Sequence, residues 1–343
     1  MLLQVNDLHI AFKTRKGVIK ATHGVSFALK AGKTLALVGE SGSGKSVSAM
    51  SILGLLDENG FVERGQAYFD EHENGNAIDL ISLKRERLYE VRGNQISVVF
   101  QEPMTALNPV LSIRRQLIEP FMVHRKMHKK QAINEALKML NAVRIPNPER
   151  VLSQYAHQLS GGMRQRVMIA MALACEPKIL IADEPTTALD VTIQAQILRL
   201  MKNLQSQTGT AILFITHDLG VVNEVADEVA VMYCGQVVEH SDKAFIFDSE
   251  YAHPYTQGLL LSIPSRAKKG QRLEQIVGNV PSPNNLPKGC KFAPRCKYAT
   301  QKCIDEEPLL FSVETGQQIC CFYPNKKERE SAKHRKIIIR PQS

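Results

Sequence analysis

The sequence predicts an α/β fold in which a largely parallel sheet carries a phosphate-binding loop. A buried-strand pattern at residues 35–38 runs directly into a glycine-rich loop and then into a helical pattern that starts at Lys45. Further along the chain, strand patterns at 178–183 and 210–216 flank a helical pattern at 193–205. Strand, helix, strand is the order that builds a parallel sheet.

The segment before the glycine-rich loop is predicted to contain several strands. Short apolar runs at 8–12 and 25–29 are separated by turn residues. The helix that starts at Lys45 is expected to run to Leu56 and to stop at residues 59–60, Asn-Gly, because glycine adopts the left-handed conformation that ends many helices.

The second half of the chain is predicted to contain a helical region and a separate appendage. Residues 103–175 have a mostly helical pattern, and the composition changes after about residue 245. The appendage is rich in proline, holds five of the seven cysteines, and ends in a basic tail at 325–343. This tail has seven Lys or Arg and two Glu, so more than half of the formal net charge of +9 lies in it.

The composition excludes several classes of protein. With 44% apolar and 22% charged residues, the chain has the composition of a folded globular protein rather than a disordered one. No apolar run reaches the 18 or so residues that a membrane-spanning helix needs. The first residues show no signal-peptide pattern, so we expect a cytoplasmic protein. The positive net charge leaves an anionic partner open.

Residues 39–46 have the sequence GESGSGKS and match the phosphate-binding pattern G-x-x-x-x-G-K-S/T. In such a loop, called the P-loop below, backbone N–H groups face phosphate oxygens, Lys45 reaches the β- and γ-phosphates, and Ser46 binds Mg²⁺. A chance glycine turn is disfavoured by the flanking strand and helix. The ATP-binding residues predicted here are Gly39, Ser41, Gly42, Ser43, Gly44, Lys45 and Ser46.

A second acidic motif follows a buried-strand pattern at 179–182. It ends in Asp183, which suits a position near the magnesium ion, and Glu184, which suits a base that polarises water. Alone, such a pair could simply cap the next helix. Its position downstream of a P-loop favours a Walker B motif.

Residues 159–166, LSGGMRQR, form a Ser-Gly-Gly turn before an apolar helix. This turn resembles the signature sequence of ATP-binding cassette (ABC) ATPases. The family's other motifs occur in order: Gln101 of the Q-loop, the TALD sequence of the D-loop at 187–190, and His217 after a strand pattern. Taken singly, Gln101 could be a surface glutamine and His217 a helix-cap histidine.

The resemblance implies a P-loop NTPase fold. Its parts would be a RecA-like parallel sheet core, an antiparallel β subdomain and an α-helical signature subdomain at about 103–175. Residues 1–245 would form the nucleotide-binding domain. Residues 246–343 would form a small cysteine-containing C-terminal extension, called the extension below.

The resemblance also implies roles for single residues. Glu184 would be the general base, His217 would contact the γ-phosphate, and Gln101 would bind magnesium and report the state of the site to a partner. Phe12 is predicted to stack on adenine, although it could equally belong to the core.

The signature turn implies that one cassette is not sufficient for hydrolysis. It would provide a second anion site, which completes the ATP pocket of a second cassette in a head-to-tail pair. The residues expected to act across that interface are Ser160, Gly161, Gly162 and Asp190.

Three segments resemble the ATPases of oligopeptide and dipeptide importers. They are VFQEPMTALNP at 99–109, HPYTQGLL at 253–260 and GCKFAPRC at 289–296. The implied function is an ATPase subunit that powers the import of di- or oligopeptides, and Ser43 favours the D-type of the two paired subunits. Nickel, glutathione and antimicrobial peptides are alternative cargoes, because their importers share such cassettes.

The implied partners are a second homologous ATPase subunit, in a heterodimer or a homodimer, and two transmembrane permease subunits. An extracytoplasmic peptide-binding protein would act indirectly, and the chain would lie on the cytoplasmic face of the inner membrane. No nucleic-acid partner is expected. A soluble ABC protein that acts on ribosomes or nucleic acid is the alternative of another class, and the basic tail would suit it.

The cysteine spacing of the appendage fits neither a C-x₂-C zinc site nor a common ferredoxin pattern. Spacing alone leaves a soft-metal site and unligated thiols as alternatives. The importer resemblance implies a 4Fe-4S cluster with a structural role. Its ligands would be Cys290, Cys296, Cys303 and Cys321, with Cys320 as the other candidate for the fourth position.

Overall fold

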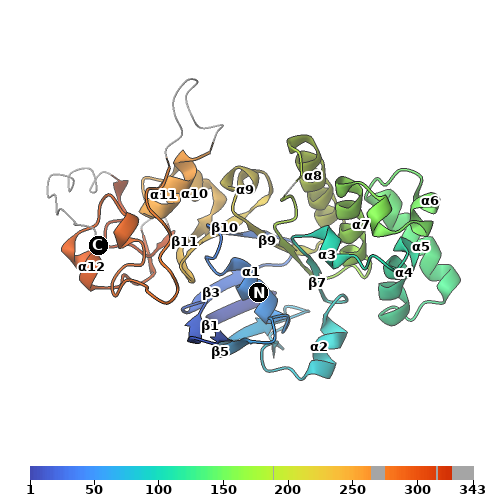
Figure 1. Ribbon diagram of the computed structural model, residues 1–343, viewed down its shortest axis with the longest axis horizontal. Coiled ribbons are helices and arrows are strands. Elements are labelled where there is room, and N and C mark those ends of the chain that lie inside the picture. Colours follow the sequence, from blue (N-terminus) through green and yellow to red (C-terminus); the bar gives the residue numbers. More distant parts are fainter. Residues whose placement is uncertain (188, 264–274, 314–315, 327–343) are drawn as a thin grey trace.

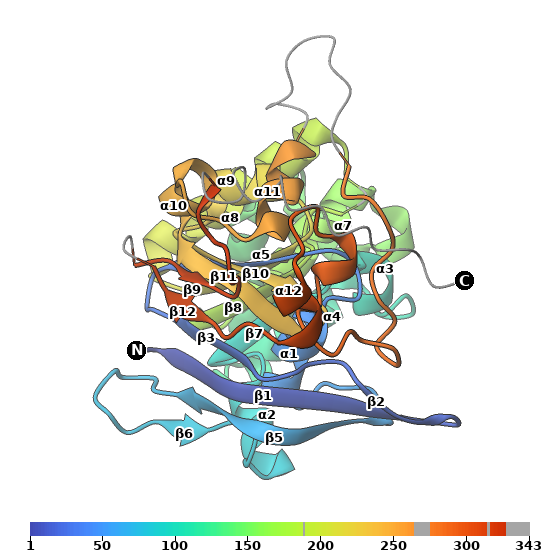
Figure 2. The ribbon, with the colours of Figure 1, turned by 90° about the vertical axis from the view of Figure 1, so that its left-hand side faces the viewer.

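The structure is a computed structural model that describes residues 1–187, 189–263, 275–313 and 316–326. These residues form two sheets, which Figures 1 and 2 show one above the other. Helices α3 to α7 gather at one end of the long axis, and the extension lies at the other end (Figure 1).

The larger sheet has eight strands in the order β12-β13-β11-β10-β4-β9-β8-β7 among the described residues. Its five strands from β10 to β7 (β10, β4, β9, β8 and β7) are paired in parallel, which confirms the predicted parallel sheet. Every residue of β4, β8 and β9 is buried, as expected for a parallel sheet covered on both faces. The strands are β4 (Thr34–Val38), β7 (Ile96–Val99), β8 (Ile179–Asp183), β9 (Ala211–Thr216), β10 (Glu228–Tyr233), β11 (Gln236–Asp242), β12 (Phe311–Ser312) and β13 (Gln318–Ile319).

The smaller sheet is antiparallel and is formed mainly by the N-terminal strands. Along β1, residues that point to the core alternate with exposed ones, which is the pattern of a strand with one buried face. Its buried side chains pack together with α1 against the larger sheet. The strands are β1 (Leu3–Thr14), β2 (Gly17–Lys20), β3 (Val25–Leu29), β5 (Gly60–Phe69) and β6 (Ile78–Asp79).

Helices fill the region 103–175, as predicted. Helices α4 to α7 share one hydrophobic core, to which α8 contributes several side chains. None of the helices in the described part of the chain has both the length and the apolarity to cross a bilayer. The helices are α1 (Lys45–Ile52), α2 (Arg85–Val91), α3 (Pro103–Ala106), α4 (Ile113–Val123), α5 (Lys129–Ala142), α6 (Pro148–Ser153), α7 (Gly161–Leu173), α8 (Val191–Thr208), α9 (Leu219–Val225), α10 (Lys243–Asp248), α11 (Pro254–Leu261) and α12 (Gln301–Asp305), with single 3₁₀ turns at Ala156–Gln158 and Ala293–Arg295.

The end of α1 differs from the prediction. The helix stops at Ile52 rather than at Leu56, and Gly54, with φ +59°, is the left-handed residue that ends it. The predicted stop glycine, Gly60, instead begins β5 and pairs with Phe12 of β1. The earlier stop leaves enough chain to turn back before that pairing begins.

The extension is not a separately packed appendage. Its strand β13 pairs with β11 of the larger sheet, so Ile319 lies opposite Glu239. Tyr255 and Phe292 of the extension also belong to one hydrophobic cluster with Tyr233 of β10. The sequence alone could not show this shared core, and the basic tail beyond residue 326 lies outside the described residues.

The packing of the β10–β11 turn can be tested by comparing alanine substitutions at two glycines, Gly235 and Gly209, which have similar left-handed backbones. A Cβ atom on Gly235 (φ +75°) would lie 2.5 Å from the Ala21 carbonyl oxygen, whereas one on Gly209 (φ +69°) would meet nothing within 4 Å. A left-handed backbone costs a residue with a Cβ about 1–2 kcal/mol, so Gly209→Ala should lose about that amount of unfolding free energy.

Gly235→Ala should lose about 1–3 kcal/mol more, because the added atom overpacks the site. Urea denaturation of both variants measures the difference. Equal losses would show that the turn tolerates the added methyl group.

Candidate nucleotide-binding and hydrolysis site

The P-loop connects β4 to α1 and packs closely against the β10–β11 turn. A Cβ atom on Gly39 would lie 2.2 Å from the Met232 carbonyl oxygen, so only glycine fits there. The Gly235 N–H donates to the Ser43 carbonyl oxygen at 3.0 Å. Ser41 and Gly42 at the tip of the loop are exposed. The loop is therefore fixed by the packing of Gly39 and the hydrogen bond of Ser43, while its tip stays exposed to solvent, as an anion-binding loop requires.

Lys45 lies folded back along the P-loop. Its Nζ donates to the carbonyl oxygens of Gly39 at 2.7 Å and Glu40 at 3.0 Å, and the residue is only 5% exposed. Burial lowers the pKa of the Lys45 ammonium, and the charges of Glu184 and Asp183 partly oppose that effect. The ammonium is therefore bonded to the P-loop backbone and is stabilised by the charges of the two acidic residues of the predicted Walker B motif.

Ser46 and Asp183 form an oxygen pair that fits Mg²⁺. The Ser46 hydroxyl donates to Asp183 Oδ1 at 2.8 Å, which joins the start of α1 to the end of β8. Burial raises the pKa of Asp183, and the hydrogen bond from Ser46 works against that rise. A hydroxyl and a carboxylate are ligands that Mg²⁺ prefers.

Glu184 is the centre of a cluster of polar side chains. Its carboxylate accepts hydrogen bonds from Gln101 Nε2 at 3.1 Å and from the Thr187 hydroxyl at 2.9 Å, and its Oε1 lies 3.0 Å from His217 Nδ1. Gln101, Glu184 and His217 follow the carboxyl ends of the neighbouring parallel strands β7, β8 and β9. The structure thus brings together the three residues predicted to be catalytic, at the edge of the sheet where such folds bind ligands.

The environment of Glu184 favours its charged form. Burial acts to raise the pKa of its carboxyl group, but the hydrogen bonds of His217 and Thr187, together with electrostatic attraction to His217 and Lys45, hold that pKa below its ordinary value. The backbone of Glu184 has a φ of +44°, a strained conformation for a residue with a side chain. Such strain is common where a side chain must be aimed at a ligand.

Thr187 is a functional candidate that the sequence analysis named only as part of the D-loop. Its hydroxyl contributes directly to the low pKa of Glu184. The sequence could have indicated this role, because Thr187 follows Glu184 by three residues. At that spacing, a turn brings the two side chains close together.

The signature turn lies away from the P-loop of the same chain. Ser160 caps α7 by accepting the Met163 N–H at 3.3 Å, and Ser160 and Gly161 are exposed. Figure 1 shows α7 well apart from α1. The roles of Ser160, Gly161 and Gly162 toward ATP stay predictions.

Asp190 lies close to the signature turn. It caps α8 by accepting the Ile193 N–H at 2.9 Å. A Cβ atom on Gly162 would lie 3.1 Å from Ile193 Cγ2, so the signature turn packs against the first turn of α8. The two predicted cross-interface elements therefore share one surface region.

Phe12 lies half-buried at the end of β1. Its ring packs over Gly60, where a Cβ atom would come within 2.8 Å of Phe12 Cε1, and it contacts the core below the small sheet. This position satisfies the alternative role of Phe12 as a core residue. Adenine stacking by Phe12 stays a prediction.

The predicted 4Fe-4S cluster is not supported by the structure. Cys290, Cys296, Cys303 and Cys321 do line one small cavity, together with aromatic and proline side chains. However, no group of three or more His, Cys, Asp or Glu within the described ranges is arranged to hold a metal ion. Cys320 does not line that cavity, and its thiol donates to the Pro308 carbonyl oxygen at 3.0 Å.

The cysteines that line the cavity have largely apolar surroundings. Burial, followed by the neighbouring thiols, raises the pKa of Cys296 to about 12, and burial also raises the pKa of Cys290. These directions hold for the metal-free cavity, and the 4Fe-4S cluster stays a prediction that the described residues do not support.

Comparison with protein-family models agrees with this geometry. A model described as ABC transporter matches residues 22–187, which include the P-loop, the signature turn and Glu184. A model described as the C-terminal region of oligopeptide/dipeptide transporters matches residues 238–303. A model described as an AAA domain, putative AbiEii toxin of a type IV toxin–antitoxin system, also matches residues 152–223.

Curated relatives match almost the whole chain. The oligopeptide transport ATP-binding protein AppD of Bacillus subtilis is 50% identical over 94% of this chain and 96% of its own length. The chain belongs to the ABC transporter ATPases. Within them, it groups with the oligopeptide transport ATP-binding proteins: OppD of Haemophilus influenzae is 47% identical, over 95% of this chain and 98% of its own length.

Solved structures show the same cassette fold as this ABC ATPase. A dimeric post-hydrolysis state of the ATP-binding cassette MJ0796 with ADP and Pi has a TM-score of 0.62 at 27% identity. It covers 71% of this chain and 99% of its own length. A second dimeric structure of MJ0796 gives a TM-score of 0.61 at 28% identity over the same shares of the two chains.

Replacing Thr187 tests the electrostatic support of Glu184. Thr187→Val keeps the shape but removes a hydrogen bond, so the pKa of Glu184 should rise toward the value that burial favours. Because a carboxylate accepts protons only above its pKa, the acid limb of the pH–kcat profile should move to higher pH.

The control is Thr14→Val, which removes an exposed hydroxyl that donates to the Gly17 carbonyl oxygen in the β1–β2 hairpin rather than to Glu184. An acid limb at the same pH in Thr187→Val and in the unmodified ATPase would contradict this role of Thr187.

Proposed function

We propose that this chain is the ATP-binding and ATP-hydrolysing subunit that powers import of di- or oligopeptides through an ABC transporter. One observation carries the proposal: Gln101, Glu184 and His217 meet beside a P-loop in a chain whose relatives are named oligopeptide transport ATP-binding proteins. The family model of the oligopeptide transporter C-terminal region supports the same class of cargo.

In the proposed reaction, the P-loop N–H groups and Lys45 bind the phosphates of ATP. Mg²⁺, held by Ser46 and Asp183 with Gln101 as a predicted further ligand, would neutralise charge on the phosphate oxygens. Glu184 orients the attacking water and takes up its proton. His217 holds the Glu184 carboxylate through its contact with Oε1 and would also contact the γ-phosphate.

A second ATPase subunit would complete each site. The exposed signature turn supports this arrangement, because Ser160 and Gly161 are free of cover on a surface apart from their own P-loop. The related cassette MJ0796 is described as dimeric. We infer a heterodimer with a homologous subunit, in which this chain is the D-type member, with a homodimer as the alternative.

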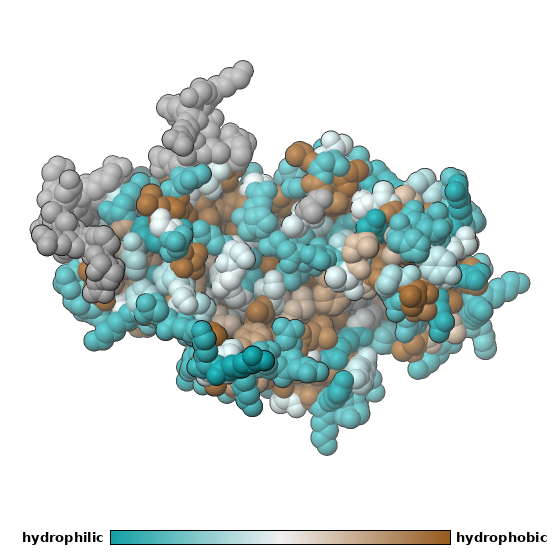
Figure 3. Space-filling view, in the orientation of Figure 1, coloured by the Kyte–Doolittle hydropathy of each residue, from teal (hydrophilic) through white to brown (hydrophobic). Residues whose placement is uncertain are grey.

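The permease subunits would dock beside Gln101. Apolar side chains are unusually exposed here: Phe100 is 41%, Met104 49% and Val110 77% exposed. The face shown in Figure 3 has hydrophobic surface in the region of α3. A helix of a transmembrane permease that packs on these side chains would lie beside Gln101. Because Gln101 is hydrogen-bonded to Glu184, a change in the position of Glu184 during hydrolysis could be transmitted to that helix.

This docking would place the chain on the cytoplasmic face of the inner membrane as a peripheral subunit. An extracytoplasmic peptide-binding protein would deliver the cargo to the permeases and would not touch this chain. The choice of peptide would therefore reside in those other subunits.

Replacing Glu184 tests the proposed chemistry. Glu184→Gln keeps the size of the side chain but removes the proton acceptor, so kcat should fall by about 10²-fold or more. The dissociation constant of MgATP should stay almost unchanged, because the P-loop contacts remain. Phosphate release and equilibrium ATP binding are the two measurements.

A matched control is Glu135→Gln, which makes the same change at the exposed ion pair with Lys138 on α5. Hydrolysis by Glu184→Gln at the rate of that control would remove Glu184 from its proposed role.

A further inference from the structure

An arginine of the extension binds the P-loop directly. Arg295 Nη1 lies 2.6 Å from Glu40 Oε2, and Arg295 Nη2 lies 3.0 Å from Glu40 Oε1. Glu40 is the second residue of the P-loop, 255 positions before Arg295. Arg295 is 4% and Glu40 30% exposed at their side chains. Two parallel bonds between a guanidinium and a carboxylate form the strong, directional kind of ion pair.

Aromatic side chains hold the guanidinium in place. Its central carbon lies 5.8 Å from the ring centre of Tyr233 and 5.9 Å from that of Phe292. The Tyr233 and Phe292 rings are themselves packed edge to face, 5.3 Å apart. The hydrogen bonds to Glu40 raise the pKa of Arg295, so the group is charged at every relevant pH. The ion pair is therefore preorganised by the shared core of β10 and the extension.

A second residue of the extension holds the same point of the loop. The Glu40 N–H donates to the Tyr255 hydroxyl oxygen at 2.8 Å, and Tyr255 is fully buried. The Glu40 carbonyl oxygen accepts from Lys45 Nζ at 3.0 Å. Arg295 and Tyr255 of the extension thus both bind Glu40. The carbonyl oxygen of Glu40 in turn positions Lys45, the lysine predicted to bind phosphate.

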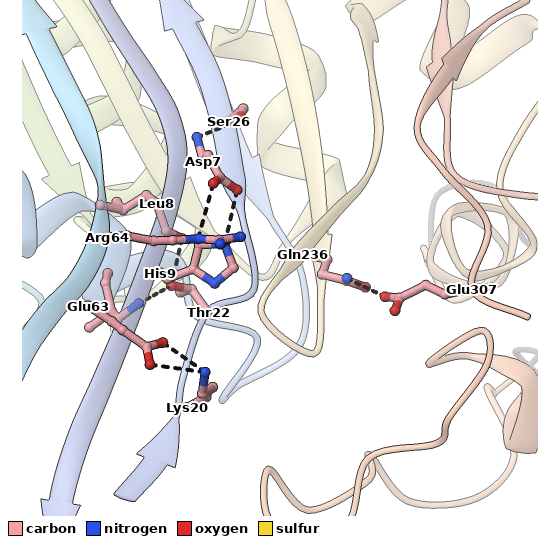
Figure 4. A network of polar contacts seen from close by, with 11 residues as sticks. Asp7, Leu8, His9, Lys20, Thr22, Ser26, Glu63, Arg64, Gln236 and Glu307 are labelled. Atoms are coloured by element: carbon pink, nitrogen blue, oxygen red, sulfur yellow. Dashed lines mark hydrogen bonds and ion pairs between the residues drawn. The ribbon is translucent and has the colours of Figure 1, made fainter.

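Other contacts dock the extension next to the loop. Gln236 Nε2 donates to Glu307 Oε1 at 2.5 Å, and Figure 4 shows these two side chains pointing toward each other from β11 and the extension. The segment 280–283 of the extension lines one cavity with Ser41 and Gly42 at the tip of the P-loop. The extension therefore covers the flank of the P-loop beyond the single ion pair.

The charge of Glu40 gives this contact a role in ligand binding. A carboxylate in an anion-binding loop repels phosphate unless a cation neutralises it. Arg295 is the cation that makes a bidentate ion pair with this carboxylate. Neutralisation and tethering therefore come from the same side chain, and that side chain belongs to the extension.

We propose that Arg295 is a positioning residue for nucleotide binding: acting through Glu40, it neutralises and fixes the P-loop, so the docked extension sets the affinity of the site for ATP. The proposal goes beyond the hydrolytic function and rests on ATP binding by the P-loop. It assigns to the extension an influence on the nucleotide that is transmitted through Glu40 of the P-loop.

The test compares MgATP dissociation constants of the full chain by equilibrium titration. Arg295→Gln should weaken binding about tenfold, because it leaves the Glu40 carboxylate unpaired beside the phosphates. The double variant Glu40→Gln/Arg295→Gln should bind more tightly than Arg295→Gln alone, because it removes the repelling charge as well. Arg295→Lys, which keeps the charge but loses the bidentate geometry, should lie between the unmodified chain and Arg295→Gln.

Lys302→Gln is the control for loss of one positive charge from the extension, since Lys302 packs on Phe322 and not on the P-loop. It should bind MgATP like the unmodified chain. A purely structural role predicts that the double variant binds no better than Arg295→Gln, and that result would overturn the proposal.

Unchanged affinity in Arg295→Gln would overturn it as well. If Arg295→Gln does not fold, the MgATP dissociation constants of Arg295→Lys and of the double variant are compared with that of the unmodified chain instead. Absence of MgATP binding by the unmodified chain would contradict the nucleotide-binding function itself, a result that differs from failure of the coupling alone.

Discussion

The parallel pairing of β7, β8 and β9 is the constraint on which the proposed site depends. Their register aligns the carboxyl ends of the three strands, so the residues that follow them meet at the Glu184 carboxylate. β4 lies on the other side of β9 and delivers the P-loop to the same edge. Because β4, β8 and β9 are buried along their whole length, this edge cannot shift without disturbing the core.

Much of the fold and of the site could be predicted from the sequence because the signals are local. The P-loop can be predicted from its glycines, from Lys45 and from the strand and helix patterns on either side. The sequence around Gln101, Glu184 or His217 alone did not separate a catalytic role from a structural one. The order of their motifs along the chain favoured the catalytic role. Their meeting point follows from the parallel sheet, which the strand, helix, strand pattern had predicted.

The features that the sequence did not reveal depend on contacts between distant segments. Gly54 ends α1 because the chain must return in time for Gly60 to pair with Phe12, and no local rule separates these two glycines. The same holds for Arg295 and Glu40, whose pairing requires the folded extension. The resemblance implied a metal cluster at the cysteines; the structure places four of them around one cavity, but no group of metal-binding residues is found among the described residues.

In the proposed mechanism, the nucleotide chemistry is divided between two surfaces of one chain: the P-loop edge, which binds ATP, and the exposed signature turn, which binds the ATP of a second cassette. Light scattering of the Glu184→Gln chain with MgATP, alone or with its partner ATPase subunit, tests that division most directly. We predict ATP-dependent dimers that disappear on adding Ser160→Asp, which keeps the helix cap but repels phosphate, and that persist with the matched cap change Ser112→Asp on α4. Dimers that survive Ser160→Asp would contradict the shared site.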